Sequence, residues 1–242
     1  MTDGESRGRA APVGGGATDP ALAVFGDRLG LAERYAELLA GAGQEQGVIG
    51  PRELPRLWDR HLVNSAVIGE VVARHARVLD VGSGAGLPGI PLVIARPDLE
   101  MTLLEPMARR VSWLESVITE LGLPVTVVRG RAEERETRRR CGEFDVVTAR
   151  AVAPLGRLVG WTLPLVRPGG VLAAMKGVSA PDEVARDAKI IRAAGGTTVT
   201  IERCGVGDAA TQVVVVHRTK RHGEAPPGIG HAGRDRKDRP RD

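Results

Sequence analysis

One short stretch of this chain holds the residue types best suited to bind a small molecule. An apolar run contains Asp80, and glycines follow at alternate positions, Gly82, Gly84 and Gly86. Glycine has no Cβ, so the backbone can turn sharply here and a ligand can lie against it. A helix is expected to begin just after the glycines, with free N–H groups and a positive dipole end. The spacing predicts a strand, a glycine turn and a helix that together cradle a cofactor.

Two cofactors are compatible with this turn. Residues 84–89 match the pattern G-x-G-x-x-G, which suits a dinucleotide. Two carboxylates favour S-adenosylmethionine: Asp80 could meet a cationic aminoacyl group and would repel a pyrophosphate, and Glu105 could accept both ribose hydroxyls. Glu105 alone would also suit the ribose of NAD, so Asp80 carries the distinction. In a purely structural alternative, the glycines only tighten a turn and both acids cap helices.

The elements that must position these residues alternate along the chain. Hydrophobic periodicity predicts strands at 77–81, 100–105, 124–129, 144–149 and 170–176. The expected helices between them are 88–96, 107–121, 155–166 and 181–194. Two last runs, 197–203 and 211–218, suit a hairpin. This order predicts an α/β fold, a Rossmann-like doubly wound sheet with an antiparallel edge strand, which binds ligands at the carboxyl ends of its strands.

The two ends of the chain differ from its middle. Amphipathic helices expected at 21–39 and 55–74 form an N-terminal helical extension, 21–74, before the sheet-bearing domain, 75–218. Residues 1–20 and the basic tail 219–242 lack apolar periodicity and are expected to be disordered. Residues 218–242 carry a net charge of +4, equal to that of the whole chain. The tail therefore suits either a tether to RNA phosphates or a solubilising extension.

Composition excludes several classes of protein. No apolar stretch of about 20 residues is present, so neither a membrane span nor a membrane partner is expected. The N-terminus lacks the apolar run of a signal peptide. Cys141 and Cys204 have neither metal nor redox spacing, so no metal site is expected and a reduced, cytoplasmic protein fits best.

Longer segments resemble one family of class I S-adenosylmethionine-dependent methyltransferases. Residues 81–92, Val-Gly-Ser-Gly-Ala-Gly-Leu-Pro-Gly-Ile-Pro-Leu, are similar to the signature of the RsmG family, also called GidB. The resemblance covers roughly residues 21–218, and its further segments are 58–65, 102–105, 109–111, 130–134, 144–151 and 174–177. The chain departs from the pattern at 48–51, Val-Ile-Gly-Pro, where many members carry Asn-Leu-Thr.

The resemblance implies an enzyme that methylates N7 of a guanine, number 527, in the 16S ribosomal RNA of the small ribosomal subunit. No DNA partner is expected. The resemblance also implies cofactor contacts, at Gly82, Leu87, Ala132, Glu133 and Arg150, to which the class I pattern adds Asp80, Gly84 and Glu105. Alternatively, Glu133 is an ordinary helix N-terminal charge and Arg150 belongs to a surface ion pair.

The implied chemistry needs little from the protein. Guanine N7 carries an exposed lone pair and no proton, so alignment with the methyl group is enough and no general base is required. Arg150 and Lys176 are the predicted catalytic residues, and Arg131 and Lys176 are predicted to contact RNA, with solvated charge as the alternative for Arg131. One helical face carries His61 and Asn64. They either belong to the RNA or cofactor surface or form a buried pair that holds this helix to the sheet.

Two other functions stay open at this point. One is a small-molecule methyltransferase with the same cofactor fold, which would act without RNA. The other is an RNA-binding assembly factor with a vestigial cofactor site. The second is disfavoured because Asp80, Gly82, Gly84 and Glu105 are all present.

Overall fold

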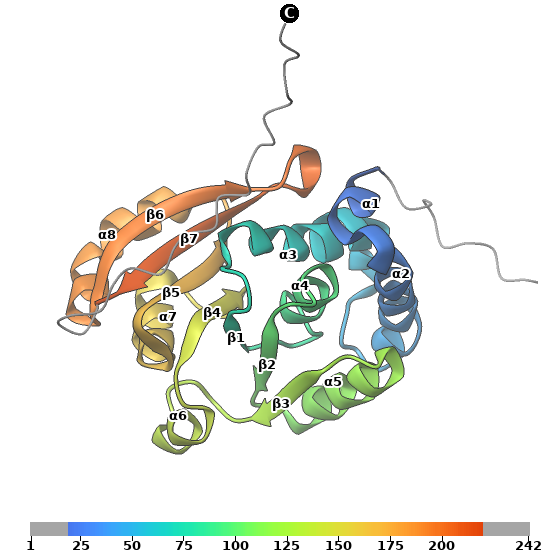
Figure 1. The fold of residues 1–242 in the computed structure, drawn as a ribbon, viewed down its shortest axis with the longest axis horizontal. Coiled ribbons are helices and arrows are strands. Elements are labelled where there is room, and N and C mark those ends of the chain that lie inside the picture. The colour runs from blue at the N-terminus through green and yellow to red at the C-terminus, as the bar shows by residue number, and fades with distance from the viewer. Residues whose placement is uncertain (1–18, 220–242) are drawn as a thin grey trace, which may run out of the picture.

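A seven-stranded sheet lies at the centre of the computed structural model, which describes residues 19–219 (Figure 1). The predictions for residues 1–20 and 219–242 therefore fall almost entirely outside the described residues. Strand order is β3-β2-β1-β4-β5-β7-β6. The strands are β1 Arg77–Val81, β2 Glu100–Glu105, β3 Val125–Arg129, β4 Phe144–Arg150, β5 Val166–Lys176, β6 Gly196–Cys204 and β7 Thr211–Arg218.

The direction of the strands decides where a ligand can bind. Strands β1 to β5 pair in parallel, β7 is antiparallel to β5, and β6 is antiparallel to β7. The predicted α/β sheet and its C-terminal hairpin are confirmed, and the antiparallel strand β7 lies one place in from the edge, which β6 forms. Chain order reverses between β1 and β4, and this reversal is the place where doubly wound sheets bind ligands.

Helices cover both faces of the sheet (Figure 1). One face carries α1 Asp19–Phe25, α2 Leu29–Leu38, α3 Asn64–Ala66, α4 Gly89–Ala95 and α5 Ala108–Leu121. The other carries α6 Arg135–Cys141, α7 Leu155–Thr162 and α8 Ala180–Ala193. Strand side chains alternate between the two cores: Val78 belongs to the first, Leu79 and Val81 to the second. No helix within residues 19–219 has both the length and the apolar character needed to cross a membrane.

The N-terminal helices share a core with the sheet. Tyr35, Leu39 and Leu62 are fully buried in the same cluster as Val78 and Leu103. Burial of large apolar side chains contributes roughly 1.5–3 kcal/mol each. The segment before β1 is thus held against the sheet by apolar packing, and this packing places its polar residues at the carboxyl ends of the strands.

The prediction of one continuous helix over 55–74 is wrong. The chain forms a 3-10 segment at Pro51–Arg56, a π-helical segment at Leu57–Val63, the single turn α3, and a 3-10 segment at Val67–Val71. The helical segment begins at Pro51, so Pro55 lies inside it, where a residue without an N–H donor cannot complete a regular α-helix. The helix expected over 21–39 also breaks, at Gly26, whose φ is +50°.

Two other expected boundaries move. The helix expected over 155–166 ends at Thr162, because Pro164 has no N–H to continue it, and β5 begins at Val166 instead of 170. The charged segment 130–142 contains helix α6, which sequence periodicity did not reveal. Of its residues only Thr137 is buried, so its sequence carries no apolar stripe.

Candidate active site

The glycine turn after β1 has the backbone conformation that glycine alone adopts readily. Gly82, Gly84 and Gly86 have φ angles of +71°, +57° and +108°. A Cβ on Gly82 would lie 2.8 Å from Cγ2 of Val152. A Cβ on Gly84 would meet nothing closer than Nη1 of Arg110, at 3.7 Å. A methyl group at Gly84 would therefore be in ordinary van der Waals contact only, and cofactor binding against this glycine stays a prediction.

Glu105 at the end of β2 joins the glycine turn. Its Oε2 accepts the N–H of Gly84 at 2.9 Å and its Oε1 accepts the N–H of Met107 at 2.9 Å. Only 1% of the residue is exposed. Each carboxylate oxygen has a second lone pair, so both oxygens can still accept a hydroxyl. This geometry fits a group that carries two adjacent hydroxyls beside Gly84.

Asp80 lies beneath the turn and is fully buried. Its Oδ2 accepts the N–H of Gly89 at 3.2 Å, where α4 begins, and its Oδ1 accepts the hydroxyl of Thr148 at 3.1 Å. Burial raises the pKa of this carboxyl to about 6. The contact with Gly89 is that of a residue that caps a helix, which is the purely structural role considered for Asp80 above. The role of Asp80 toward a cationic aminoacyl group stays a prediction.

Two aromatic donors that the sequence did not single out hold the same turn. The Tyr35 hydroxyl and the Trp113 Nε1–H both donate to the carbonyl oxygen of Ala85, each at 2.9 Å. Tyr35 comes from α2 and Trp113 from α5, so two neighbouring helices on one face of the sheet fix the turn. Tyr35 is the only tyrosine of the chain, and it is fully buried in an amphipathic helix. A buried tyrosine needs a hydrogen-bond partner, and that need is the signal that could have revealed it.

Alanine substitutions at Gly82 and Gly84 are expected to differ in their effects on stability and on cofactor binding. Gly84→Ala is expected to fold with a loss of about 1 kcal/mol, since only the left-handed backbone resists it, but to bind S-adenosylmethionine much more weakly because the new methyl group enters the cradle. Gly82→Ala also collides with Val152 and should lose more stability. Thermal unfolding and calorimetric titration of both variants provide the check. Wild-type cofactor affinity in Gly84→Ala would remove Gly84 from the site.

The remaining predicted cofactor contacts lie around the cradle. Leu87 is partly buried and its N–H bonds the carbonyl of Ser83 at 3.0 Å. Ala132 follows β3 with 4% exposure. Glu133 and Arg131 beside it are exposed, and the backbone N–H of Arg131 bonds Glu134 at 3.3 Å. All four sit on the segments that follow β1 and β3, and their ligand contacts stay predictions.

A basic cavity of about 540 Å³ lies at the carboxyl ends of β4 and β5. Four cationic side chains line it, Arg60, Arg150, Lys176 and Arg203, and none of the described residues in its wall is acidic. Val152 also lines it and is the side chain that lies against Gly82. The basic cavity and the glycine cradle are therefore neighbours separated by one side chain. Arg60 and Arg203 were not predicted, because nothing in the sequence connects them to β4.

Arg150 reaches from the end of β4 to the segment before β1. Its Nη1 donates to the Ser65 hydroxyl at 2.9 Å and its Nη2 to Nδ1 of His61 at 2.8 Å. Burial lowers the pKa of this guanidinium. Asn64 donates to the carbonyl of Ala209 at 3.2 Å. His61 is buried and holds this segment to β4, as in the structural interpretation, whereas Asn64 is partly buried and lines the basic cavity. Arg150 is not part of a surface ion pair.

Lys176 at the end of β5 is already paired. Its Nζ donates to Oε2 of Glu183 at 2.8 Å and to the carbonyl of Ala153 at 2.9 Å, and its side chain is 10% exposed. The contact with Ala153 holds the loop between β4 and α7. Lys176 would have to leave these partners in order to contact RNA. Catalysis and RNA binding by Lys176 stay predictions, and sequence reasoning missed its partner Glu183.

The strand order β3-β2-β1-β4-β5-β7-β6 with β7 antiparallel, together with the glycine turn after β1 and the acid at the end of β2, is the fold of a class I S-adenosylmethionine-dependent methyltransferase. A solved structure described as a predicted O-methyltransferase from Agrobacterium tumefaciens has the same fold, with a TM-score of 0.51 at 17% identity, over 67% of this chain and 90% of that one. At that identity the likeness concerns the fold alone.

The chain belongs to the GidB family, described as rRNA small subunit methyltransferase G, whose family model matches residues 28–212. It is similar to the ribosomal RNA small subunit methyltransferase G of Mycolicibacterium smegmatis, with 49% identity over 92% of this chain and 94% of the relative. The protein of that name from Corynebacterium jeikeium is 55% identical over 81% of this chain and 90% of its own. The predicted family, a methyltransferase that uses S-adenosylmethionine, is confirmed.

Proposed function

We propose that this protein transfers a methyl group from S-adenosylmethionine to N7 of a guanine in small-subunit ribosomal RNA. The basic cavity beside the glycine cradle carries this proposal. Its volume of about 540 Å³ lies in the range of small-ligand sites, roughly 300–1,000 Å³. Its four cations suit a nucleotide with its phosphates, and a guanidinium plane can also stack on an unpaired base. The names of the relatives favour small-subunit ribosomal RNA as the source of that nucleotide.

The reaction suits the residues present. S-adenosylmethionine supplies a methyl group on a cationic sulfur. Glu105 and the turn at Gly82 and Gly84 would hold it, and Leu87, Ala132 and Glu133 would contact its adenosine. The lone pair of guanine N7 would form the bond to the methyl carbon while the bond from that carbon to sulfur breaks, so that S-adenosylhomocysteine leaves. N7 carries no proton, so no residue has to act as a base. Among the described residues in the cavity wall there is neither a carboxylate nor a histidine, as such a reaction permits.

Different parts of the chain contribute to the methyltransferase domain and to the surface that binds RNA. Residues 75–218 form the methyltransferase domain, and residues 21–74 form a helical extension that contributes Arg60 and Asn64 to the cavity wall. Arg60 and Arg203 are exposed and suit the phosphates of the entering strand. Arg150 is partly buried and nearer the cradle, so it suits the base or the reacting groups. Arg131 would contact RNA from the far side of the cradle.

The product identifies the reaction. Purified protein is incubated with S-adenosylmethionine and either deproteinised small-subunit RNA or intact small subunits, and the RNA is then digested to nucleosides for mass spectrometry. The expected product is N7-methylguanosine at one position, which fragment mapping should locate at guanine 527. A methyl group on another atom would contradict the assignment. Methylation of free metabolites alone would favour the small-molecule alternative, and RNA binding without transfer would favour the assembly factor.

A further inference from the structure

A chain of hydrogen bonds runs from the surface of the N-terminal segment to the basic cavity. Oε2 of Glu53 lies 2.8 Å from Nε2 of His61, and Nδ1 of the same imidazole lies 2.8 Å from Nη2 of Arg150. The second guanidinium nitrogen, Nη1, bonds Ser65. His61 is 8% exposed, whereas the Glu53 side chain is 38% exposed. Arg150 is the only member of this chain that lines the cavity.

The donors and acceptors fix the proton on His61. A guanidinium has N–H donors and no acceptor, so Nδ1 of His61 must accept from Arg150. Nδ1 therefore carries no proton, and the imidazole is neutral with its proton on Nε2. That N–H points at the carboxylate of Glu53, which accepts it. The carboxylate selects the tautomer and orients the ring, in the way that a carboxylate orients many functional histidines.

The charges around His61 act in opposite directions. Burial lowers the pKa of His61 below its ordinary value of 6.5, and Arg150 and Arg60 act in the same direction, while Glu53 opposes them. Beyond the guanidinium lie the buried groups Tyr35 of α2 and Asp80 of β1. The neutral form is thus the stable form near pH 7, as the contact with Arg150 requires.

We propose that His61 is a positioning residue for methyl transfer, whose neutral imidazole, oriented by Glu53, holds the Arg150 guanidinium at the wall of the acceptor cavity. This inference rests on the proposed function, because it assigns the cavity to the methyl acceptor. Protonation of His61 places an N–H at Nδ1 against the N–H of Arg150. Nη2 of the guanidinium then loses its acceptor, and the guanidinium is repelled by a like charge. Methyl transfer should therefore fall as the pH drops through the pKa of His61, below 6.5.

Two substitutions remove the two hydrogen bonds of His61 one at a time. His61→Asn places an amide oxygen near the position of Nδ1, so Arg150 keeps its acceptor while Glu53 loses its donor. His61→Gln reaches the position of Nε2, so Glu53 keeps a donor while Arg150 loses its acceptor. Each variant removes one buried hydrogen bond, so their melting temperatures should fall by similar amounts. The kcat of the Gln variant should be lower than that of the Asn variant by roughly 10- to 100-fold, as for a misplaced active-site group.

The pH dependence of kcat distinguishes a positioning role of His61 from a purely structural one, which would not change it. The wild-type kcat should show an acid limb below pH 6.5, and His61→Asn, which gains no proton, should lose it. Glu53→Gln should shift the limb to lower pH, because the carboxylate raises the pKa of His61. Glu53 is partly exposed, so this variant is expected to fold even if both His61 variants do not. Burial raises the pKa of Asp80 to about 6, so an identical limb in wild type and His61→Asn would belong to Asp80 and overturn the proposal.

Nitrogen NMR of the labelled protein tests the contact without any assay of activity. The expected spectrum shows His61 neutral at pH 7.5 with its proton on Nε2 and a pKa below 6.5. A proton on Nδ1, or equal kcat losses in the Asn and Gln variants, would overturn the positioning role. If wild-type protein transfers no methyl group to small-subunit RNA, the proposed function fails instead, and the NMR tautomer still decides the contact between His61 and Arg150.

Discussion

Arg150→Ala is expected to lower kcat for methyl transfer by at least about 100-fold, the loss seen when a preorganised donor is removed from an active site. Arg150 is a partly buried cation in the wall of the basic cavity, with two side-chain bonds that fix its direction. Its removal leaves Ser65 and Nδ1 of His61 without a partner, at a cost of about 1–3 kcal/mol. For a chain of this size each kcal/mol lowers the melting temperature by about 2–4 °C.

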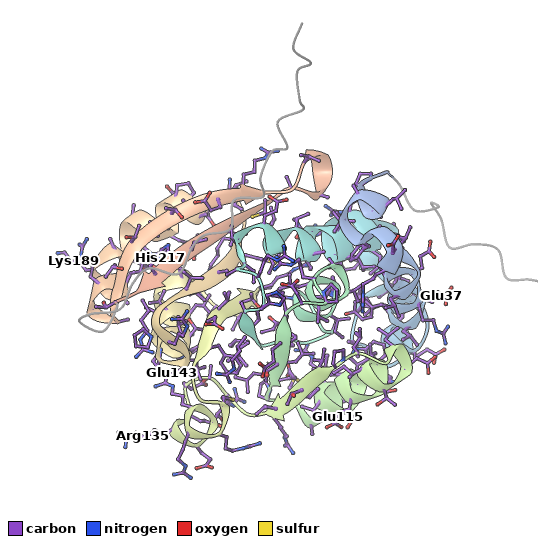
Figure 2. The ribbon with its side chains drawn as sticks, in the orientation of Figure 1. Glu37, Glu115, Arg135, Glu143, Lys189 and His217 are labelled. Atoms are coloured by element: carbon purple, nitrogen blue, oxygen red, sulfur yellow. The ribbon has the colours of Figure 1, made fainter. Side chains whose placement is uncertain are left out.

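Two further variants separate the position of this cation from its charge. Arg150→Lys keeps the charge but replaces the two nitrogens that bond Ser65 and His61 separately by a single nitrogen, so it should recover little of the lost activity. Lys189→Ala removes one exposed positive charge from the outer side of α8, far from the cavity, and should behave as wild type (Figure 2). The measurements are single-turnover methyl transfer at saturating cofactor, calorimetric cofactor affinity and thermal unfolding. Full activity of Arg150→Ala would remove this residue from the active site.

Glu105→Ala is expected to weaken S-adenosylmethionine binding by roughly 10- to 150-fold, which corresponds to the loss of about 1.5–3 kcal/mol for hydrogen bonds to a charged group. The carboxylate lies where the glycine turn meets the end of β2, with two oxygens that can still accept hydroxyls. The alanine variant also releases the N–H groups of Gly84 and Met107. The turn should therefore become more mobile, and hydrogen exchange at Gly84 should increase.

Glu100 offers a matched control for this loss. It begins the same strand that Glu105 ends, and its side chain is 74% exposed near Arg77. Glu100→Ala should leave the cofactor affinity unchanged, because surface changes seldom reach beyond about 0.5 kcal/mol. Calorimetric titration of both variants with S-adenosylmethionine decides the matter. Equal affinities in wild type and Glu105→Ala would show that the cofactor lies elsewhere.

The sequence by itself determined the fold class and the order in which the predicted site residues follow the strands. The alternation of strands and helices predicted the doubly wound sheet, and the glycine spacing predicted the turn after β1, since only glycine adopts three positive φ angles so close together without strain. The order of elements also placed Glu105 and Arg150 at one edge of the sheet, because parallel strands share the direction of their carboxyl ends. These inferences rest on local periodicity and on topology, both of which the linear order of residues contains.

The broken helices of the N-terminal segment were less accessible to sequence reasoning. Residues 55–74 carry enough apolar residues to suggest one amphipathic helix, and Pro55 was placed at its first turn, where proline is tolerated. In the structure the segment bends to follow the sheet, with Leu57, Leu62 and Ile68 buried in one core. Tertiary packing decided this path, since burial of several large side chains exceeds the preference of the backbone for a regular helix.

Only the tertiary structure decided which side chains are partners. Tyr35 and Trp113 converge on Ala85, Lys176 pairs with Glu183, and Glu53 reaches Arg150 through His61. His61 and Arg150 are 89 residues apart, so no local pattern relates them. Their contact exists because the N-terminal segment packs across the carboxyl end of β4 and because a buried guanidinium must find acceptors there. Residue types and spacing therefore predicted which residues form the site, whereas the fold alone decided which side chains His61 and Arg150 contact.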